Sequence, residues 1–378
     1  MKGRLATVAL VPALCALMAG CASKPYSPLT APGTTTGIMA PPEVAPEIVV
    51  LPHEPAAVIG LDNVETGPVS MPIGTNRPAA KHPPLFGTGW IPLRTWSDRC
   101  GLGTPERVVA GGITVYRVTT RGGVAKLTIG SRLAQWNGVS VWLGFAPQLV
   151  RGEPRIHALD AEKTLLPLAE MSRAPQTRAR TVVLDPGHGG SDSGTRSAKN
   201  ELEKHYTLDW ARRTERLLTN AGWRVFLTRR TDVEVGLSER VSFAERVQAD
   251  LFISLHFNST FPQTHPSGIE TYCLTPTGVP STLVRGYSDD ERAFFPNNAF
   301  DGVNLLWAFR IHQSLLKETR THDDGVKRAR FMSVLRYQNR PAVLVEGGFL
   351  SNPQDAANIG SGIYRESLAR AVADALLK

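Results

Sequence analysis

The sequence predicts an α/β fold with a mostly parallel sheet and flanking helices, preceded by a small β-rich domain. From residue 181 to residue 378, apolar runs of strand length alternate with segments of helical periodicity, which is typical of layered α/β domains. Residues 85–170 instead hold short runs rich in β-branched residues, two of them separated by Gly122-Gly123. A glycine pair between two such runs indicates a hairpin turn.

Helices and strands can be assigned in order along the α/β region. The helix that begins at Glu203 should end at Ala221-Gly222, because glycine adopts the left-handed conformation of a helix cap without strain. The expected helices cover residues 203–220, 237–247, 304–319 and 363–377. The expected strands cover residues 181–184, 223–228, 251–255, 269–274, 331–336 and 342–345. Open sheets of this kind place their sites beyond the carboxyl ends of the strands, so we expect the functional residues there.

The small domain is predicted from four strand candidates, which cover residues 112–118, 124–129, 139–143 and 156–159. Its residues form no cluster of the types that bind metals, since His157 stands alone. We therefore expect a structural or binding role for residues 85–170. A polar linker, residues 171–180, should connect this domain to the α/β domain at residues 181–378.

The first 21 residues indicate export. Lys2 and Arg4 precede a short apolar stretch that runs to Met18, and this order is typical of a signal peptide, here residues 1–20. The run LMAGC that ends at Cys21 resembles a bacterial lipobox. That resemblance implies cleavage before Cys21 and lipidation of its thiol, and two or more acyl chains would anchor the chain stably in a membrane.

Residues 21–84 carry this cysteine and 13 of the 28 prolines of the chain. Proline favours extended, semi-rigid conformations, so we expect a tether. At ~3.1 Å per residue for a polyproline-like chain, about 63 residues would reach on the order of 200 Å.

The composition excludes several classes of protein. The chain is 42% hydrophobic and 20% charged, which fits a globular protein. Its net charge is +8, but the basic residues form no long block, so we expect no nucleic-acid partner. Four cysteines are too few and too far apart for a disulfide scaffold. No apolar run after Cys21 reaches the ~18 residues that a membrane helix needs.

Two histidines occupy equivalent places in the predicted sheet. The segment LDPGHGG, residues 184–190, follows the first strand of the α/β domain. Its proline and glycines impose a tight turn, so His188 should emerge on a rigid support. The segment SLHFN, residues 254–258, ends the third strand with His256. Because side chains alternate along a strand, Asn258 shares one side of the strand with His256.

Acidic residues complete a possible site. Glu201 and Glu203 lie two residues apart at the start of a helix and cannot share a helix face, so at most one of them can point at His188. Two imidazoles and one carboxylate form a catalytic zinc arrangement with a fourth position open to water. Glu346 follows the apolar strand 342–345, where a buried unpaired charge would be costly. It either caps the strand in solvent or serves as a general base in the site.

At this point the chain resembles a known family. LDPGHGG, LEK (residues 202–204), SLHFN and VEGGFLSNP (residues 345–353), in this order, look like the motifs of zinc-dependent N-acetylmuramoyl-L-alanine amidases, which are bacterial cell-wall enzymes. The resemblance covers residues 181–378. Residues 85–170 weakly resemble the copper amine oxidase N-terminal-like domain.

The resemblance implies one zinc ion held by His188, Glu203 and His256. Glu203 is chosen over Glu201 because the carboxylate of the family directly precedes a lysine. The implied reaction is hydrolysis of the amide between N-acetylmuramic acid and L-alanine in peptidoglycan, with a zinc-bound water as nucleophile and Glu346 as general base and acid. Asp185 and Asn258 are candidates for hydrogen bonds that orient the histidines, and turn capping explains them equally well.

The resemblance also implies partners and a location. We expect a peptidoglycan substrate and a monomer held by its lipid anchor on the periplasmic side of a bacterial membrane, and the sequence identifies no protein activator. Two alternatives are a non-catalytic peptidoglycan-binding lipoprotein and a zinc peptidase that cuts stem peptides, although the HExxH motif of many such peptidases is absent.

The long stretch from Thr275 to Phe300 departs from the pattern of the family. We expect it to overhang the carboxyl ends of the strands. Its acidic run, residues 289–291, would then block the zinc, or its aromatic run, residues 294–296, would line the substrate groove, or the insertion has no role.

Lipidation at Cys21 can be tested directly. Cys21→Ser should leave a precursor that is neither acylated nor cleaved by the lipoprotein route, because the thiol is the acylated group. Metabolic labelling with palmitate measures this, and label in the variant at the level of the unchanged protein would contradict it.

Overall fold

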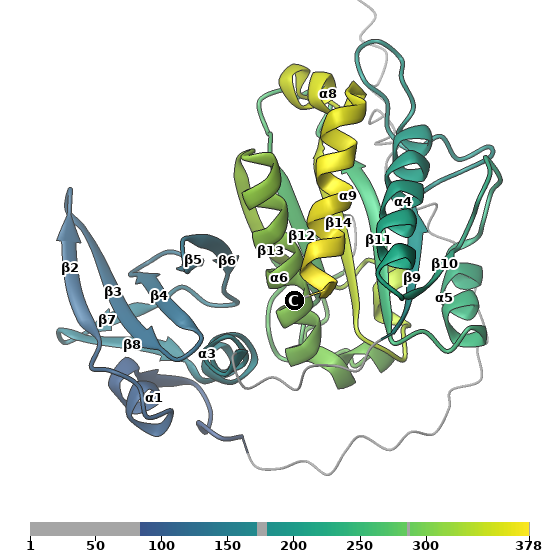
Figure 1. Cartoon of the computed structure of the whole chain (residues 1–378). Coiled ribbons are helices and arrows are strands. Elements are labelled where there is room, and N and C mark those ends of the chain that lie inside the picture. Colours follow the sequence, from purple (N-terminus) through teal and green to yellow (C-terminus); the bar gives the residue numbers. More distant parts are fainter. Residues whose placement is uncertain (1–83, 172–179, 286–287, 378) are drawn as a thin grey trace, which may run out of the picture. The chain divides into compact units, whose positions relative to one another are not determined.

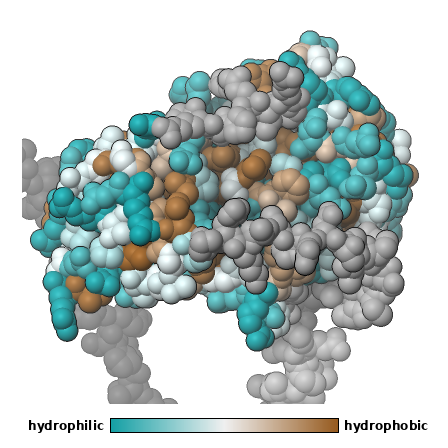
Figure 2. Space-filling view, turned by 90° about the horizontal axis from the view of Figure 1, so that it is seen from below, coloured by the Kyte–Doolittle hydropathy of each residue, from teal (hydrophilic) through white to brown (hydrophobic). Residues whose placement is uncertain are grey.

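The computed structural model describes residues 84–171, 180–285 and 288–377 (Figure 1). The predicted signal peptide, the lipidation site and the tether up to residue 83 lie outside the described residues, as does most of the predicted linker. No helix among the described residues is long and apolar enough to cross a membrane. The face of the molecule shown in Figure 2 carries hydrophobic areas separated by hydrophilic ones.

Residues 84–171 are rich in strands, as the sequence predicts. Strands β2 to β6 pair antiparallel in sequence order, and β1, β8 and β7 form a separate sheet. The predicted hairpin is present, since Thr120 pairs with Gly123 across a two-residue turn. The strands are β1 (Trp90–Pro92), β2 (Glu106–Ala110), β3 (Ile113–Thr120), β4 (Gly123–Thr128), β5 (Leu133–Trp136), β6 (Val139–Trp142), β7 (Gln148–Val150) and β8 (Glu153–His157). The helices are α1 (Leu93–Arg99), α2 (Ala158–Asp160) and α3 (Leu166–Ala169), with a π-helical turn at Ala161–Leu165.

Residues 180–377 alternate strands with helices. The apolar runs that predict strands are buried along their whole length in β9 and β11, as expected for strands covered on both faces. The strands are β9 (Thr181–Pro186), β10 (Arg224–Leu227), β11 (Leu251–Asn258), β12 (Ile269–Leu274), β13 (Asp323–Ala329) and β14 (Ala342–Phe349). The helices are α4 (Glu203–Asn220), α5 (Leu237–Arg246), α6 (Asp301–Thr319), α7 (Ser333–Arg336), α8 (Pro353–Gly360) and α9 (Gly362–Leu377), with a 3-10 turn at Pro296–Phe300.

The strand order in this region is β10-β9-β11-β14-β12-β13. The first four strands are parallel, and β12 is parallel to β13 but antiparallel to β14. The prediction of a mostly parallel sheet is therefore confirmed. The carboxyl ends of β9, β11 and β14 meet at one edge of the sheet, and β12 begins there.

Helices cover both faces of this sheet. Figure 1 shows α4, α6 and α9 side by side over one face, where Trp210, Phe309 and Leu368 pack against inward residues of the strands. The opposite face is covered by α5 and α7, whose Ala244 and Leu335 belong to a second buried cluster. Helix α4 ends as predicted, with Gly222 at φ 85.

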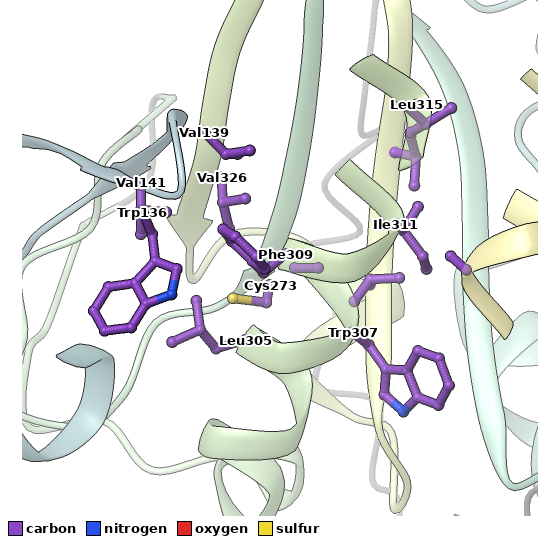
Figure 3. Close-up of a cluster of buried hydrophobic side chains, with 14 of the residues drawn as sticks. Trp136, Val139, Val141, Cys273, Leu305, Trp307, Phe309, Ile311, Leu315 and Val326 are labelled. Atoms are coloured by element: carbon purple, nitrogen blue, oxygen red, sulfur yellow. The ribbon is translucent and has the colours of Figure 1, made fainter. Parts of the chain in front are cut away.

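One hydrophobic cluster joins the two β regions. Strand β6 pairs with β13 through Val141 and Val326. Figure 3 shows Trp136 and Val141 beside Val326, with Leu305 and Phe309 of α6 closing the cluster. These buried side chains make the small β-rich region and the α/β region continuous in packing.

The predicted strand at residues 331–336 is wrong. Residues 333–336 form the short helix α7, and the strand is instead β13, at residues 323–329. β13 carries the half-buried Lys327, which pairs with Glu270 and Asp324, and the buried Arg328, which donates to Thr164. Tertiary pairing thus allows a charged segment to enter the sheet where hydropathy does not predict it.

Candidate active site

His188 stands in the tight turn after β9 that its glycines predict. Its φ is 62, a left-handed value that non-glycine residues seldom adopt. Two buried arginines hold the turn by its carbonyls: Arg240 donates to the oxygens of Pro186 and His188, both at 3.0 Å, and Arg229 donates to that of Gly187 at 2.8 Å. These bonds compensate the backbone strain and fix where the imidazole points.

His256 lies on β11 next to the turn of His188. The two imidazole rings meet edge to face with centroids 4.9 Å apart. A side chain at Gly187 would meet the His256 ring at 2.1 Å, so glycine is required there. His256 also pairs in register with Glu346 of β14, and this pairing brings the fourth predicted residue to the same edge of the sheet.

Glu203, the first residue of α4, connects the two histidines. Its Oε1 lies 3.1 Å from Nδ1 of His256, and its Oε2 lies 3.2 Å from Nε2 of His188. The carboxylate also accepts hydrogen bonds from the backbone N–H groups of Thr195 and Phe257. One ligand atom from each of His188, Glu203 and His256 lies within 4.8 Å of the others. This buried cluster has the donor set and the spacing to hold a metal ion.

Glu201 points elsewhere, since its carboxylate accepts from the hydroxyl of Ser197 at 3.0 Å. The prediction that only one of the two glutamates can reach His188 is therefore confirmed.

The histidines and carboxylates of the cluster shift one another's pKa values. Burial raises the pKa of Glu203, but the adjacent His188 and His256 hold it well below its usual range. Burial lowers the pKa of His188, and the carboxylates of Glu203 and Asp192 overcome this and raise it to about 10. A cation with higher charge than a proton could replace that proton, because histidine binds metals in its neutral form.

Glu346 is buried at the end of the apolar part of β14. Both carboxylate oxygens lack a hydrogen bond to any described residue. Burial raises the pKa of Glu346 well above its usual range, and the negative charges of Glu203 and Glu270 raise it further. Of the two interpretations open from the sequence, a solvated cap is excluded, because only 1% of this residue is exposed.

Of the two residues predicted to orient the histidines, Asp185 is linked to one of them and Asn258 is not. Asp185 accepts a hydrogen bond from the hydroxyl of Ser254 at 2.8 Å, and the Oγ of Ser254 lies 3.1 Å from Nε2 of His256. Asp185 is thus linked to the histidine through one serine. Within the described residues, Asn258 does not hydrogen-bond to either imidazole ring, and its amide instead donates to the carboxylate of Glu270.

Besides Ser254, three polar residues of the site were not predicted. Asp192 lies 2.8 Å from Nδ1 of His188, a carboxylate–histidine contact that fixes the ring and its tautomer. Glu270 pairs with Glu346 across β12 and β14, and Arg285 donates to Asn258. The sequence signal for Glu270 is its position as a charged residue within the otherwise mostly apolar strand 269–274.

The expected position of the insertion at residues 275–300 is wrong for most of its length. Because β12 is antiparallel to β14, the insertion starts at the opposite end of the sheet. Its acidic run does not reach the cluster: Asp289 pairs with Arg330 at 2.6 Å, and Asp290 pairs with Arg292. In the aromatic run, Phe295 stacks edge to face on Tyr337.

Comparison with known proteins places this site in a family. The family described as N-acetylmuramoyl-L-alanine amidase, Amidase_3, matches residues 182–378, which contain every residue of the cluster. The chain belongs to this amidase family.

Curated proteins that are similar in sequence to this chain carry the same family description. The chain is 29% identical over 237 residues to the N-acetylmuramoyl-L-alanine amidase AmiC of Escherichia coli, covering 56% of each chain. It is 34% identical over 194 residues to the amidase LytC of Bacillus subtilis, covering 51% of this chain and 34% of that one. The chain therefore spans about half the length, or less, of these relatives. The solved structure of the amidase AmiC2 of Nostoc punctiforme is 30% identical and aligns with 52% of this chain and 94% of its own, with a TM-score of 0.44.

Gly194 offers a test of how tightly the cluster is packed. Its φ is 63, and a Cβ there would lie 2.6 Å from both Oε2 of Glu203 and Cδ2 of His188. Gly194→Ala should therefore displace the carboxylate and lower the affinity for zinc by about 10-fold or more, as loss of supporting contacts does at metal sites. Calorimetric zinc titration measures this. Gly236→Ala is the control, because nothing lies within 4 Å of that position, and equal affinity in both variants would contradict the geometry.

Proposed function

We propose that the chain is a zinc-dependent N-acetylmuramoyl-L-alanine amidase, which hydrolyses the amide bond between N-acetylmuramic acid and L-alanine in peptidoglycan. The observation that carries this proposal is the buried, unpartnered carboxylate of Glu346 at the His188–Glu203–His256 cluster. Membership of the amidase family supports the choice of this amide as the bond that is cut.

The residues present fit a zinc ion. Two histidines and one glutamate are a donor set of catalytic zinc sites, which keep a position open for water or substrate. Nε2 of His188 is buried and lies close to Glu203 without the geometry of a hydrogen bond. Buried polar atoms of native proteins are normally satisfied, so this nitrogen and the oxygens of Glu346 favour a bound group between them. Bound zinc would supply a Lewis acid that acidifies water to a pKa near ~7 and polarises a carbonyl.

Side chains of this protein would transfer the proton of the attacking water to the leaving group. Glu346 would accept a proton from the attacking water and return it to the amine of the leaving L-alanine. Burial and nearby negative charge raise the pKa of Glu346, and a raised pKa suits a carboxylate that must hold a proton between two steps. Asp192 would keep His188 in one tautomer, and Asp185, acting through Ser254, would do so for His256.

The products distinguish this function from the two alternatives. Purified peptidoglycan digested with the full chain should yield intact stem peptides with a free L-alanine amine, together with glycan strands whose muramic acid is unsubstituted. Mass spectrometry of the released fragments identifies both. Cleavage inside the stem peptide would instead identify a peptidase, and binding to the wall without release would identify a binding module.

We also propose a location and an arrangement for the enzyme. The signal-peptide and lipobox patterns at residues 1–21 support a lipoprotein held through Cys21 on the periplasmic side of a bacterial membrane. The proline-rich residues 22–84 would then let the amidase domain reach the wall. A structural or wall-binding role for residues 85–170, and a monomeric chain, complete the proposal.

Substitution of the two neighbouring glutamates tests the ligand assignment. Glu203→Ala should abolish zinc retention and activity together, since two remaining ligands hold zinc poorly. Glu201→Ala should retain both, because its carboxylate bonds to Ser197 outside the cluster. Zinc content per chain after gel filtration gives the answer. A severe loss in Glu201→Ala with zinc retained in Glu203→Ala would reverse the assignment.

Substitution of Glu346 tests the proton-transfer role. Glu346→Gln should keep zinc and substrate binding and lose roughly 10²–10⁴ in kcat, the usual contribution of general acid–base catalysis. Zinc analysis and steady-state kinetics on a soluble muropeptide check both parts. A variant that also lost its zinc would show that Glu346 is a ligand rather than the base.

A further inference from the structure

The insertion at residues 275–300 returns to the active site at Arg285. After leaving the far end of β12, it runs back along β13, where the backbone N–H of Thr282 donates to the carbonyl of Arg328 at 2.8 Å. Leu283 then packs on the second buried cluster, which includes Tyr272. This path brings Arg285 to Asn258, and its Nη2 donates to Oδ1 of that residue at 3.0 Å.

The contact with Asn258 places Arg285 beside the catalytic carboxylates. Asn258 is the last residue of β11, two residues beyond the proposed ligand His256. Its side-chain amide donates to Glu270, which faces Glu346 in the antiparallel register. The positive charge of Arg285 lowers the pKa of Glu346 against the effect of burial, so the guanidinium acts electrostatically on the site.

The guanidinium of Arg285 retains unused donors. Among the described residues, no carboxylate lies within ion-pair distance of it, and Asn258 supplies its hydrogen-bond acceptor. A guanidinium has five N–H donors in a fork that matches a carboxylate. Arg330, by contrast, is bound by Asp289 and by the carbonyls of Pro276 and Val279. Arg285 is also only half-buried, so a ligand can reach it.

Three acidic residues of β12 and of the insertion already have basic partners. Glu270 is bound by Lys327, Tyr272 and Asn258. Asp289 and Asp290 of the insertion have their own arginine partners. Among the described residues Arg285 forms no ion pair, and its charge acts on the buried Glu346 without a direct bond, so an anion that approaches from solvent can bind its free N–H groups.

We propose that Arg285 determines specificity by binding a free carboxylate of the peptide that follows L-alanine in the substrate. This inference rests on the proposed amidase function, because it names the part of that substrate that the insertion recognises. The peptide carries carboxylates close to the scissile amide, and a charge-assisted bond to Arg285 would hold the amide at the cluster. Arg285 thus contributes to binding, whereas Glu346 carries the proton.

A pair of ligands that differ only in this charge tests the proposal. MurNAc-L-Ala-D-Glu has a free α-carboxylate, and MurNAc-L-Ala-D-isoGln has an uncharged amide in its place. The zinc-loaded full chain should cleave the acid with a kcat/KM about 10- to 100-fold higher, the range expected for one hydrogen bond to a charged group. In Arg285→Ala this preference should disappear through a higher KM for the acid, whereas any change in kcat caused by loss of the positive charge near Glu346 should be equal on the two ligands.

Two further variants isolate the effect. Arg292→Ala is the matched control, because Arg292 lies in the same insertion with its side chain 92% exposed and paired to Asp290, and it should keep the preference. Arg285→Lys should restore part of it, since lysine keeps the charge without the fork. No preference in the unchanged chain, or a preference for the acid that survives in Arg285→Ala, would overturn the proposal.

A binding measurement separates this inference from the proposed function. Calorimetry with zinc-loaded Glu346→Gln should show tighter binding of the acid than of the amide, and Arg285→Ala added to that background should remove the difference. If the unchanged chain cleaves neither ligand, the proposed amidase function fails on these substrates, while a charge preference in binding still supports recognition by Arg285. Equal binding of the two ligands overturns the recognition whatever the kinetics show.

Discussion

The site depends on the contacts that the carboxylate of Glu203 makes with the two histidines. This carboxylate lies between Nε2 of His188 and Nδ1 of His256 and accepts two backbone N–H groups, all within a buried cluster. A buried charge is costly unless it is paired and hydrogen-bonded, and here the fold supplies every partner. The first turn of α4, the turn after β9 and the end of β11 must therefore all be in place for the cluster to exist.

The direction of β12 shapes the surroundings of that cluster. As the antiparallel neighbour of β14, it sets Glu270 opposite Glu346 and adds a second buried carboxylate beside that of Glu346. Lys327 of β13 compensates Glu270, so the pKa of Glu346 is raised without leaving two uncompensated charges together. The same direction sends the insertion to the far end of the sheet, and Arg285 returns from there to contact Asn258.

Much of this arrangement follows from local sequence patterns. Gly and Pro around His188 predict its turn, apolar runs predict β9, β11 and β14, and the glycine after Ala221 predicts the end of α4. Those patterns also predict that His188, His256 and Glu346 meet, because parallel strands share a carboxyl edge. The resemblance to the amidase family then selects Glu203 over Glu201, which helical spacing alone leaves open.

What could not be predicted depends on contacts between distant residues. Lys327 and Arg328 enter β13 because Glu270 and Thr164 pair with them, and hydropathy carries no signal of such partners. The antiparallel entry of β12 likewise depends on its pairing with β14, so the course of the insertion was placed wrongly. Asp192 and Ser254 are ordinary loop and strand residues in the sequence, and their roles emerge only when they approach the two imidazoles.

Locating the metal tests this account most directly. Crystals of the zinc-loaded chain, measured on both sides of the zinc absorption edge, should show one anomalous peak within bonding distance of His188, Glu203 and His256, with Glu346 close by but not bound to the metal. A chain that crystallises without zinc at this cluster after loading, or a zinc ion bound through other residues, would contradict it.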